Sequence, residues 1–315
     1  MQKPLNETNE QPAKLNEGKQ AVDLDSPGVA KALAKRIATD VDEYCAKVYD
    51  DGPRRHLGAS LIGHECSRYL WYVFRWVHHE KHDGRQQRLF NRGHREEARF
   101  IEWLEGIGFK IWFENRDEAP DAEGNYPQYR ISGVNGHFGG SLDGIAQLPE
   151  RYGINEPVLL EFKTNGTGAG FNKLLSDGMP VAKPQHFAQT STYGFKYQFR
   201  YVVYLNICKN DDNIHIEVAK LDHKLGAQME AKAERIILSQ TPPARLSDNP
   251  TFRDCTWCGM KGVCHKADKP AVNCRSCKNA SPVENAEFFC SVHNAIIPRE
   301  VIPQACPQYK AITDV

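Results

Sequence analysis

The sequence predicts an α/β protein in which a mixed central sheet is flanked by helices and followed by a cysteine-rich C-terminal tail. Two observations lead to this prediction. Helix-like and strand-like segments alternate between about residues 28 and 250, an order typical of a sheet covered by helices. Six of the ten cysteines then fall within residues 255–290. Because the chain shows no secretory signal, this clustering favours metal ligands over disulfides.

The first part of the chain is expected to be helical after a disordered start. Residues 1–27 are polar and show no period that could bury a face, so we expect them to be disordered. Apolar residues then recur every three or four positions over 29–48, which predicts an amphipathic helix. The aromatic segment 60–76 predicts a largely buried helix, and the apolar stripe in 88–108 predicts another.

Strands are expected in the middle of the chain, with helices between and after them. Alternation and β-branched or aromatic residues predict strands over 109–115, 129–136, 139–148, 158–164, 200–208 and 213–221. Helical patterns lie in 172–197 and 224–240. The stretch 241–252 is rich in proline and polar residues and marks a boundary. We therefore expect a disordered tail (1–27), a main domain (28–250), a cysteine segment (251–268) and a terminal tail (269–315).

Composition limits the possible classes of protein. Lys plus Arg equals Asp plus Glu at 40 each, so contact with nucleic acid would depend on local patches. One basic run lies in 54–95 and includes Arg68, Arg75 and Arg88. We find no run of 18 apolar residues and no signal peptide, which predicts a cytoplasmic protein without membrane contact.

The segment PVLLEFKT, residues 157–164, carries two charges in a strand that otherwise resembles core. Glu161 and Lys163 lie two positions apart and share one face, while Leu160 and Phe162 face the other. If the strand containing Asp143 pairs with this one, its carboxylate approaches Glu161. Two such carboxylates repel unless a cation lies between them, and their oxygens suit Mg²⁺ or Mn²⁺. With an ammonium beside them, the pattern predicts a hydrolytic site.

Asp143 followed eighteen residues later by Glu161-x-Lys163 resembles the PD-(D/E)XK nuclease superfamily. Two further motifs resemble its RecB-like exonuclease branch. These are Gly93-x-x-x-Glu97 and Gln189-x-x-x-Tyr193, each expected on a helix.

The resemblance implies a restriction-endonuclease-like core and a metal-dependent deoxyribonuclease, an exonuclease acting on DNA that is single-stranded or has free ends. Glu97, Asp143 and Glu161 would hold the metal, with His94 competing for the role of Glu97. Lys163 would orient the attacking water, and Gln189 and Tyr193 would place the DNA strand.

Two other functions stay open at this point. The same residues would serve an endonuclease that cuts structured DNA, and the fold would also serve a module that only binds DNA ends. The resemblance suggests replication, recombination or repair in a bacterium or a phage, with the host cytoplasm as the location in the second case.

Cys255, Cys258 and Cys264 form a Cys-x-x-Cys-x5-Cys pattern that leaves a tetrahedral site one ligand short. With the distant Cys66, the pattern resembles AddB-type nucleases and CRISPR-associated adaptation exonucleases. This resemblance implies a 4Fe-4S cluster that joins the two ends of the domain, with zinc as the rival metal. Cys66 as a plain buried thiol and His265 as the fourth ligand are the alternatives.

A second set of metal-ligand residues lies in the terminal tail. Cys274-x-x-Cys277 and Cys290-x-x-His293 are paired ligands separated by twelve residues, a spacing typical of a structural zinc site. Cys306 is an alternative to His293. Such a tail would bind DNA, bind a partner protein or only stabilise itself.

Overall fold

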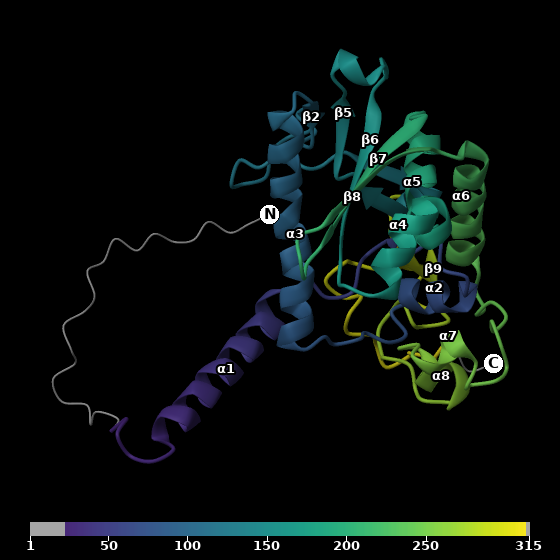
Figure 1. Ribbon diagram of the computed structural model, residues 1–315. Coiled ribbons are helices and arrows are strands. Elements are labelled where there is room, and N and C mark those ends of the chain that lie inside the picture. Colours follow the sequence, from purple (N-terminus) through teal and green to yellow (C-terminus); the bar gives the residue numbers. More distant parts are fainter. Residues whose placement is uncertain (1–22, 313–315) are drawn as a thin grey trace. The chain divides into compact units, whose positions relative to one another are not determined.

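The computed structural model describes residues 23–312, so most of the expected disordered tail lies outside the described residues. These residues form two compact units (Figure 1). The smaller unit contains residues 23–51 and 81–96. It holds helix α1 (Val29–Val48) and the first part of helix α3 (Gly84–Gly106), and Arg88 pairs there with Asp42. None of the helices within residues 23–312 is long and apolar enough to cross a membrane.

The larger unit contains residues 52–80 and 97–312 and is built on a five-stranded mixed sheet. Its strand order is β2-β5-β6-β7-β8. The strands are β2 (Lys110–Trp112), β5 (Gly144–Gln147), β6 (Val158–Asn165), β7 (Tyr201–Cys208) and β8 (Ile214–Lys220). The central pair β6 and β7 is parallel, and the other neighbours are antiparallel. The predicted fold class, a mixed sheet flanked by helices, is therefore confirmed.

Helices cover both faces of this sheet (Figure 1). On one face the last turns of α3 pack through Phe100 and Leu104 against Leu160 and Phe162 of β6. The opposite face packs against α4 (Ala169–Ala182) and α5 (Pro184–Tyr197), and α6 (His223–Leu238) packs against α5. Glu161 and Lys163 alternate with Leu160 and Phe162, so they belong to the face that α5 covers.

The remaining elements are short. A second sheet has the order β1-β4-β3 and contains β1 (Leu57–Gly58), β3 (Arg130–Gly133) and β4 (Phe138–Ser141). A third, β11-β10-β9, lies in the terminal tail and contains β9 (Ala280–Pro282), β10 (Phe288–Cys290) and β11 (Ala295–Ile296). The other helices are α2 (Ser67–Phe74), α7 (Arg253–Thr256), α8 (Lys261–His265) and the 3₁₀ turns Val134–Gly136 and Glu150–Tyr152.

The strands expected over 109–115 and 129–136 are shorter, Lys110–Trp112 and Arg130–Gly133, and three elements differ more strongly from the sequence prediction. The helix expected over 60–76 is only α2, because Cys66 caps it by accepting a hydrogen bond from the backbone N–H of Tyr69. The helical region 172–197 is two helices that meet at Lys183, and proline begins the second of them. The strand expected over 139–148 is broken into β4 and β5, which belong to different sheets.

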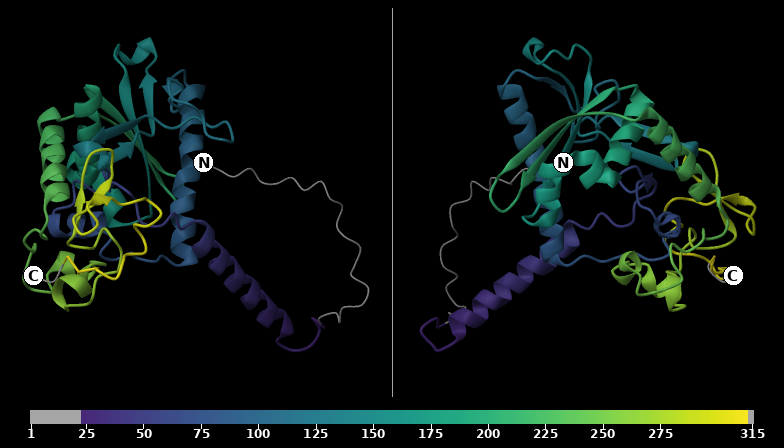
Figure 2. Two further views of the ribbon diagram at one scale, coloured as in Figure 1. Left: turned by 180° about the vertical axis from the view of Figure 1, so that it is seen from behind. Right: turned by 45° about the vertical axis from the view of Figure 1, so that its right-hand side comes forward.

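The cysteine-rich tail packs on the core of the larger unit (Figure 2). Arg75, the C-cap of α2, is fully buried and donates to the backbone oxygen of Ala280, and Asn273 donates to that of Trp76. The ring of Phe288 packs against Phe74. Arg75 therefore supports the tail, and its place in the basic run 54–95 does not make it a DNA contact.

Candidate active site

Glu161 and Lys163 lie in the middle of the sheet, on the central strand β6. The Glu161 side chain is fully buried, and its Oε1 accepts from the Lys163 ammonium. Lys163 also donates to the backbone oxygen of Phe162 at 3.1 Å, and a quarter of its side chain is exposed. The other carboxylate oxygen, Oε2, is buried and has no hydrogen-bond partner among residues 23–312. A buried acceptor without a hydrogen-bond partner destabilises the folded state unless a ligand binds it.

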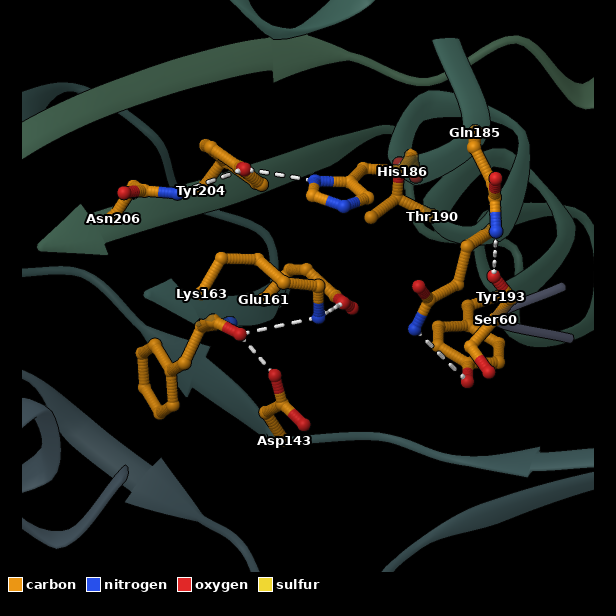
Figure 3. A network of polar contacts seen from close by, with 12 residues as sticks. Ser60, Asp143, Glu161, Lys163, Gln185, His186, Thr190, Tyr193, Tyr204 and Asn206 are labelled. Carbon is orange, nitrogen blue, oxygen red and sulfur yellow. Dashed lines mark hydrogen bonds and ion pairs between the residues drawn. The ribbon is translucent and has the colours of Figure 1, made fainter. Parts of the chain in front are cut away.

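Asp143 lies at the break between β4 and β5, directly before the residue pair Gly144–Leu160 of the β5–β6 ladder. Its Oδ2 accepts from the backbone N–H of Phe162 at 2.7 Å (Figure 3). In a continuous strand the Phe162 N–H would bond to a backbone oxygen of the neighbouring strand. Here it bonds to the Asp143 carboxylate instead, which explains why the strand is interrupted at Asp143. The antiparallel register continues from this pair and sets Asp143 opposite Glu161.

Glu97 comes from helix α3, and its carboxyl acts electrostatically on those of Asp143 and Glu161. Three carboxyl groups and one ammonium therefore meet from a helix, a strand break and a strand. His94, the competing candidate, is exposed and belongs to the smaller unit, whereas Glu97 belongs to the larger one.

Burial controls the charge state of these groups. Burial raises the pKa of Glu161 to about 7; the Lys163 ammonium opposes this rise, and the charge of Asp143 adds to it. Burial and then the charge of Asp143 raise the pKa of Glu97 to about 7, against Lys163. Burial acts to lower the pKa of Lys163, but Glu161 and Asp143 together raise it above its usual value. The lysine therefore stays charged, and burial favours the protonated forms of Glu161 and Glu97.

Gln189 and Tyr193 lie on the buried face of α5, one turn apart. Gln189 Nε2 donates to the Tyr193 hydroxyl at 3.3 Å, and the charges of Glu161 and Asp143 act on that hydroxyl. The tyrosine needs a glycine beside it, because a side-chain carbon on Gly140 would collide with its hydroxyl. Tyr193 lies at the edge of the carboxylate group (Figure 3).

Three further polar residues lie beside this group and were missed in the sequence. Tyr204 and Asn206 on β7 pair in register with Glu161 and Lys163. Asn206 Nδ2 donates to the Tyr204 hydroxyl at 3.2 Å, and that hydroxyl lies 2.9 Å from Nδ1 of His186 on α5 (Figure 3). His186 lies one turn before Gln189, so helical spacing alone would have pointed to it.

These side chains suit a divalent cation. The evidence is the partnerless Oε2 of Glu161 together with the carboxyls of Asp143 and Glu97, whose charges act on it. Hard oxygen ligands of this kind are those that Mg²⁺ and Mn²⁺ accept. Even so, no group of three His, Cys, Asp or Glu residues in the described part of the chain forms a ready-made metal site. Glu161 is instead held by Lys163, and Asp143 by the Phe162 backbone.

The first cysteine set lines one pocket formed by α2, α7 and α8. Cys66, Cys255, Cys258 and Cys264 all line it, and so does His265. Burial and then the neighbouring thiols Cys264 and Cys66 raise the pKa of Cys255. Burial is also the largest cause that raises the pKa of Cys258, on which the other three thiols act as well. A shared pocket of thiols does not by itself show an iron-sulfur cluster, so the cluster stays a prediction.

The second cysteine set lines a separate pocket in the terminal tail. Cys274, Cys277, Cys290 and His293 line it, as predicted ligands should, and Cys306 lines it too. Burial raises the pKa of Cys274, and among the thiols that act on it Cys306 has the largest effect. His293 Nε2 lies 3.5 Å from the Cys306 sulfur. Zinc at this pocket also stays a prediction.

Comparison with known proteins gives distant matches only. No protein-family model matches the chain, and no curated protein matches it. Among solved structures, SSO0001 is 15% identical with a TM-score of 0.42, covering 72% of this chain and 96% of its own. The alkaline exonuclease LHK-Exo from Laribacter hongkongensis is 16% identical with a TM-score of 0.37, covering 58% and 87%. The structure of the same exonuclease in complex with dAMP is 17% identical with a TM-score of 0.35, covering 58% of this chain and 86% of its own. Likenesses this distant do not assign an activity to the chain.

Proposed function

We propose that the protein is a metal-dependent nuclease that hydrolyses DNA phosphodiester bonds from free ends. The observation that carries this proposal is the buried Glu161, which has one oxygen without a partner and the other on Lys163. Burying a carboxylate and an ammonium together adds little stability to a folded chain. The simplest reason for the buried pair of Glu161 and Lys163 is therefore that it binds a ligand. DNA and action from an end follow from the sequence motifs that resemble the RecB-like branch.

In the proposed site Glu97, Asp143 and Glu161 hold Mg²⁺ or Mn²⁺. Such an ion, when bound, polarises a phosphoryl oxygen and makes its bound water more acidic. Lys163, charged and held by Glu161, places an ammonium where negative charge develops on the phosphate. Gln189 and Tyr193 position the strand. Hydrolysis joins water to phosphorus and breaks one P–O bond, which leaves a phosphate monoester and a hydroxyl.

The test is cleavage of end-labelled linear DNA with Mg²⁺ or Mn²⁺, compared with a covalently closed circle of the same sequence. We expect the linear DNA to be degraded and the circle to survive. Cleavage of the circle would replace the exonuclease by an endonuclease. Binding of ends without any cleavage would leave only a binding module.

We also propose that the two cysteine pockets hold metals. Cys66, Cys255, Cys258 and Cys264 would hold a 4Fe-4S cluster, and their place around one shared pocket supports this. Cys274, Cys277 and Cys290 would hold zinc with His293 or Cys306, which line the same pocket. Protein purified without oxygen should absorb near roughly 400 nm and contain iron and zinc. A colourless preparation that contains zinc but no iron would show that the first pocket binds zinc instead of a cluster.

We propose that each of these sites belongs to one segment of the chain. It has a nuclease domain over 28–250, a cluster segment over 251–268 that closes on Cys66, and a zinc tail over 269–315.

A further inference from the structure

We propose that His186 is a phosphate contact for the bound DNA strand, donating a hydrogen bond from Nε2 beside the ammonium groups of Lys163 and Lys183. The inference rests on the proposed function for its ligand, a nucleic-acid phosphate, and it assigns a role to a residue outside the motifs of the sequence.

The chain of hydrogen bonds from β7 to α5 satisfies the buried Tyr204 hydroxyl in one direction. The Tyr204 hydroxyl has two partners in the described chain, Nδ2 of Asn206 and Nδ1 of His186. The amide nitrogen of Asn206 donates to the hydroxyl, and Nδ1 of His186 is the one partner in the described chain that can accept the hydrogen of this buried hydroxyl. Nδ1 therefore carries no proton, and the neutral ring carries its hydrogen on Nε2.

Burial keeps each group in this state at neutral pH. It raises the pKa of Tyr204 to about 12, so the hydroxyl keeps its hydrogen. Burial, followed by the charges of Lys163 and Lys183, lowers the pKa of His186 to about 3, so the ring stays neutral. The geometry and these charge states agree on one tautomer.

The surroundings of His186 suit an anion. The charges that act on its ring are two ammonium groups, those of Lys163 and Lys183. In Figure 3 the second ring nitrogen points toward the side of the network where Glu161 and Lys163 lie. No hydrogen bond to Nε2 occurs within residues 23–312, and the side chain is partly exposed. The ring also stands at the first turn of α5, whose amide dipoles favour negative charge.

A phosphate is the anion that a strand would bring here. Register pairs Lys163 with Asn206 and Glu161 with Tyr204, so the network adjoins the proposed scissile position directly. A strand held at Lys163 carries its next phosphate within one nucleotide of that position. His186 and Lys183 would hold this neighbouring phosphate and so fix the strand at the site.

The test compares three substitutions at His186 in binding to single-stranded DNA with Ca²⁺, which replaces Mg²⁺ so that binding is measured apart from cleavage. Glutamine puts an amide N–H near Nε2, whereas asparagine puts one near Nδ1. We expect His186→Ala and His186→Asn to weaken binding about tenfold, and His186→Gln to weaken it by less than about threefold. Thermal unfolding of each variant checks that the fold is kept.

A second measurement locates the contact on the DNA. A single neutral methylphosphonate is moved along the strand, and its effect on binding is measured with the native protein and with His186→Ala. At one linkage beside the scissile one, the neutral group should weaken binding to the native protein about tenfold and change binding to the variant little. Equal effects on both proteins at every linkage would overturn the inference.

The outcomes separate this inference from the proposed function. If the native protein cleaves DNA and the His186 variants bind and cleave like it, the phosphate contact is wrong and the nuclease stands. If the native protein binds DNA, cleaves none with any divalent metal and loses binding in His186→Ala, the contact stands and the nuclease is wrong. Absence of DNA binding by the native protein would overturn both.

Discussion

The carboxylate site on the sheet and the two cysteine pockets differ in how the chain holds them. Glu161 and Lys163 are fixed by the register of a central strand, and the ammonium partly offsets the charge of the carboxylate. The cysteines instead lie in loops, in the four- and five-residue helices α7 and α8, at the N-cap of α2 and at the end of the short strand β10. The sheet site is therefore held by the pairing of its strands, whereas the thiols of the two pockets would depend on the proposed metals to stay together.

The largest effect is expected from removing the lysine. Lys163→Ala should lower the rate of DNA cleavage about a thousandfold, because no other ammonium contacts Glu161 in the described chain. The measurement is single-turnover cleavage of end-labelled DNA. Lys220→Ala, on the exposed end of β8, is the matched control and should cleave like the native protein. Cleavage by Lys163→Ala at the native rate would show that Lys163 is not needed for the reaction.

Removing the metals should loosen the cysteine segments but not the central sheet. After chelation, amide hydrogen exchange over residues 245–268 and 274–306 should speed up more than about tenfold, while the amides of β6 and β7 change little. Equal acceleration in both regions would show that the sheet depends on metal as well.

A matched substitution separates the metal from general damage. Cys66→Ala should lose the metal of the first pocket and lower the unfolding temperature by about 5–10 °C. Cys45→Ala and Cys208→Ala should keep that metal, because neither residue lines the pocket. Retention of metal by Cys66→Ala would favour His265 as the fourth ligand.

The sheet site should cost stability that its metal offsets. The pKa of Glu97 is raised from 4.5 to about 7, so the stability of the folded state is fully present below pH 4.5 and falls as the pH rises through 7. Without metal, Glu97→Gln should therefore stabilise the protein by about 1–2 kcal/mol at pH 8 and by little at pH 5. Urea unfolding at both pH values measures this difference. A variant less stable than the native protein at pH 8 would contradict the account.

The smallest effect concerns the contact of the tail with the core. His137 Nε2 lies 2.8 Å from the backbone oxygen of Val283, and burial lowers the pKa of His137 to about 4. Between pH 6.5 and pH 4 the unfolded chain takes up a proton that the folded chain does not, so stability falls as the pH falls. His137→Gln keeps a donor but does not titrate, and should reduce this loss by about 1–2 kcal/mol. An unchanged pH profile would contradict this interpretation.

The sequence predicted the mixed sheet and the faces of β6, because alternation along a strand follows from backbone geometry alone. It did not predict the strand break at Asp143, where a side-chain bond to the Phe162 backbone replaces a ladder bond. Residue spacing offered Cys306 as an alternative to His293 but could not choose between them, and both line the pocket of Cys274. His186 was within reach, since it stands one helical turn from Gln189 on the same face.

The central claim is that Glu97, Asp143 and Glu161 share one divalent ion beside Lys163. Electron paramagnetic resonance of Mn²⁺ titrated into the protein without DNA tests it most directly, with Asp143→Asn as the comparison. We expect one Mn²⁺ to bind at these carboxyls in the native protein, and we expect the substitution to lower the affinity for Mn²⁺ at least about tenfold. Equal Mn²⁺ affinity in both proteins, or no bound Mn²⁺ in the native protein, would contradict it.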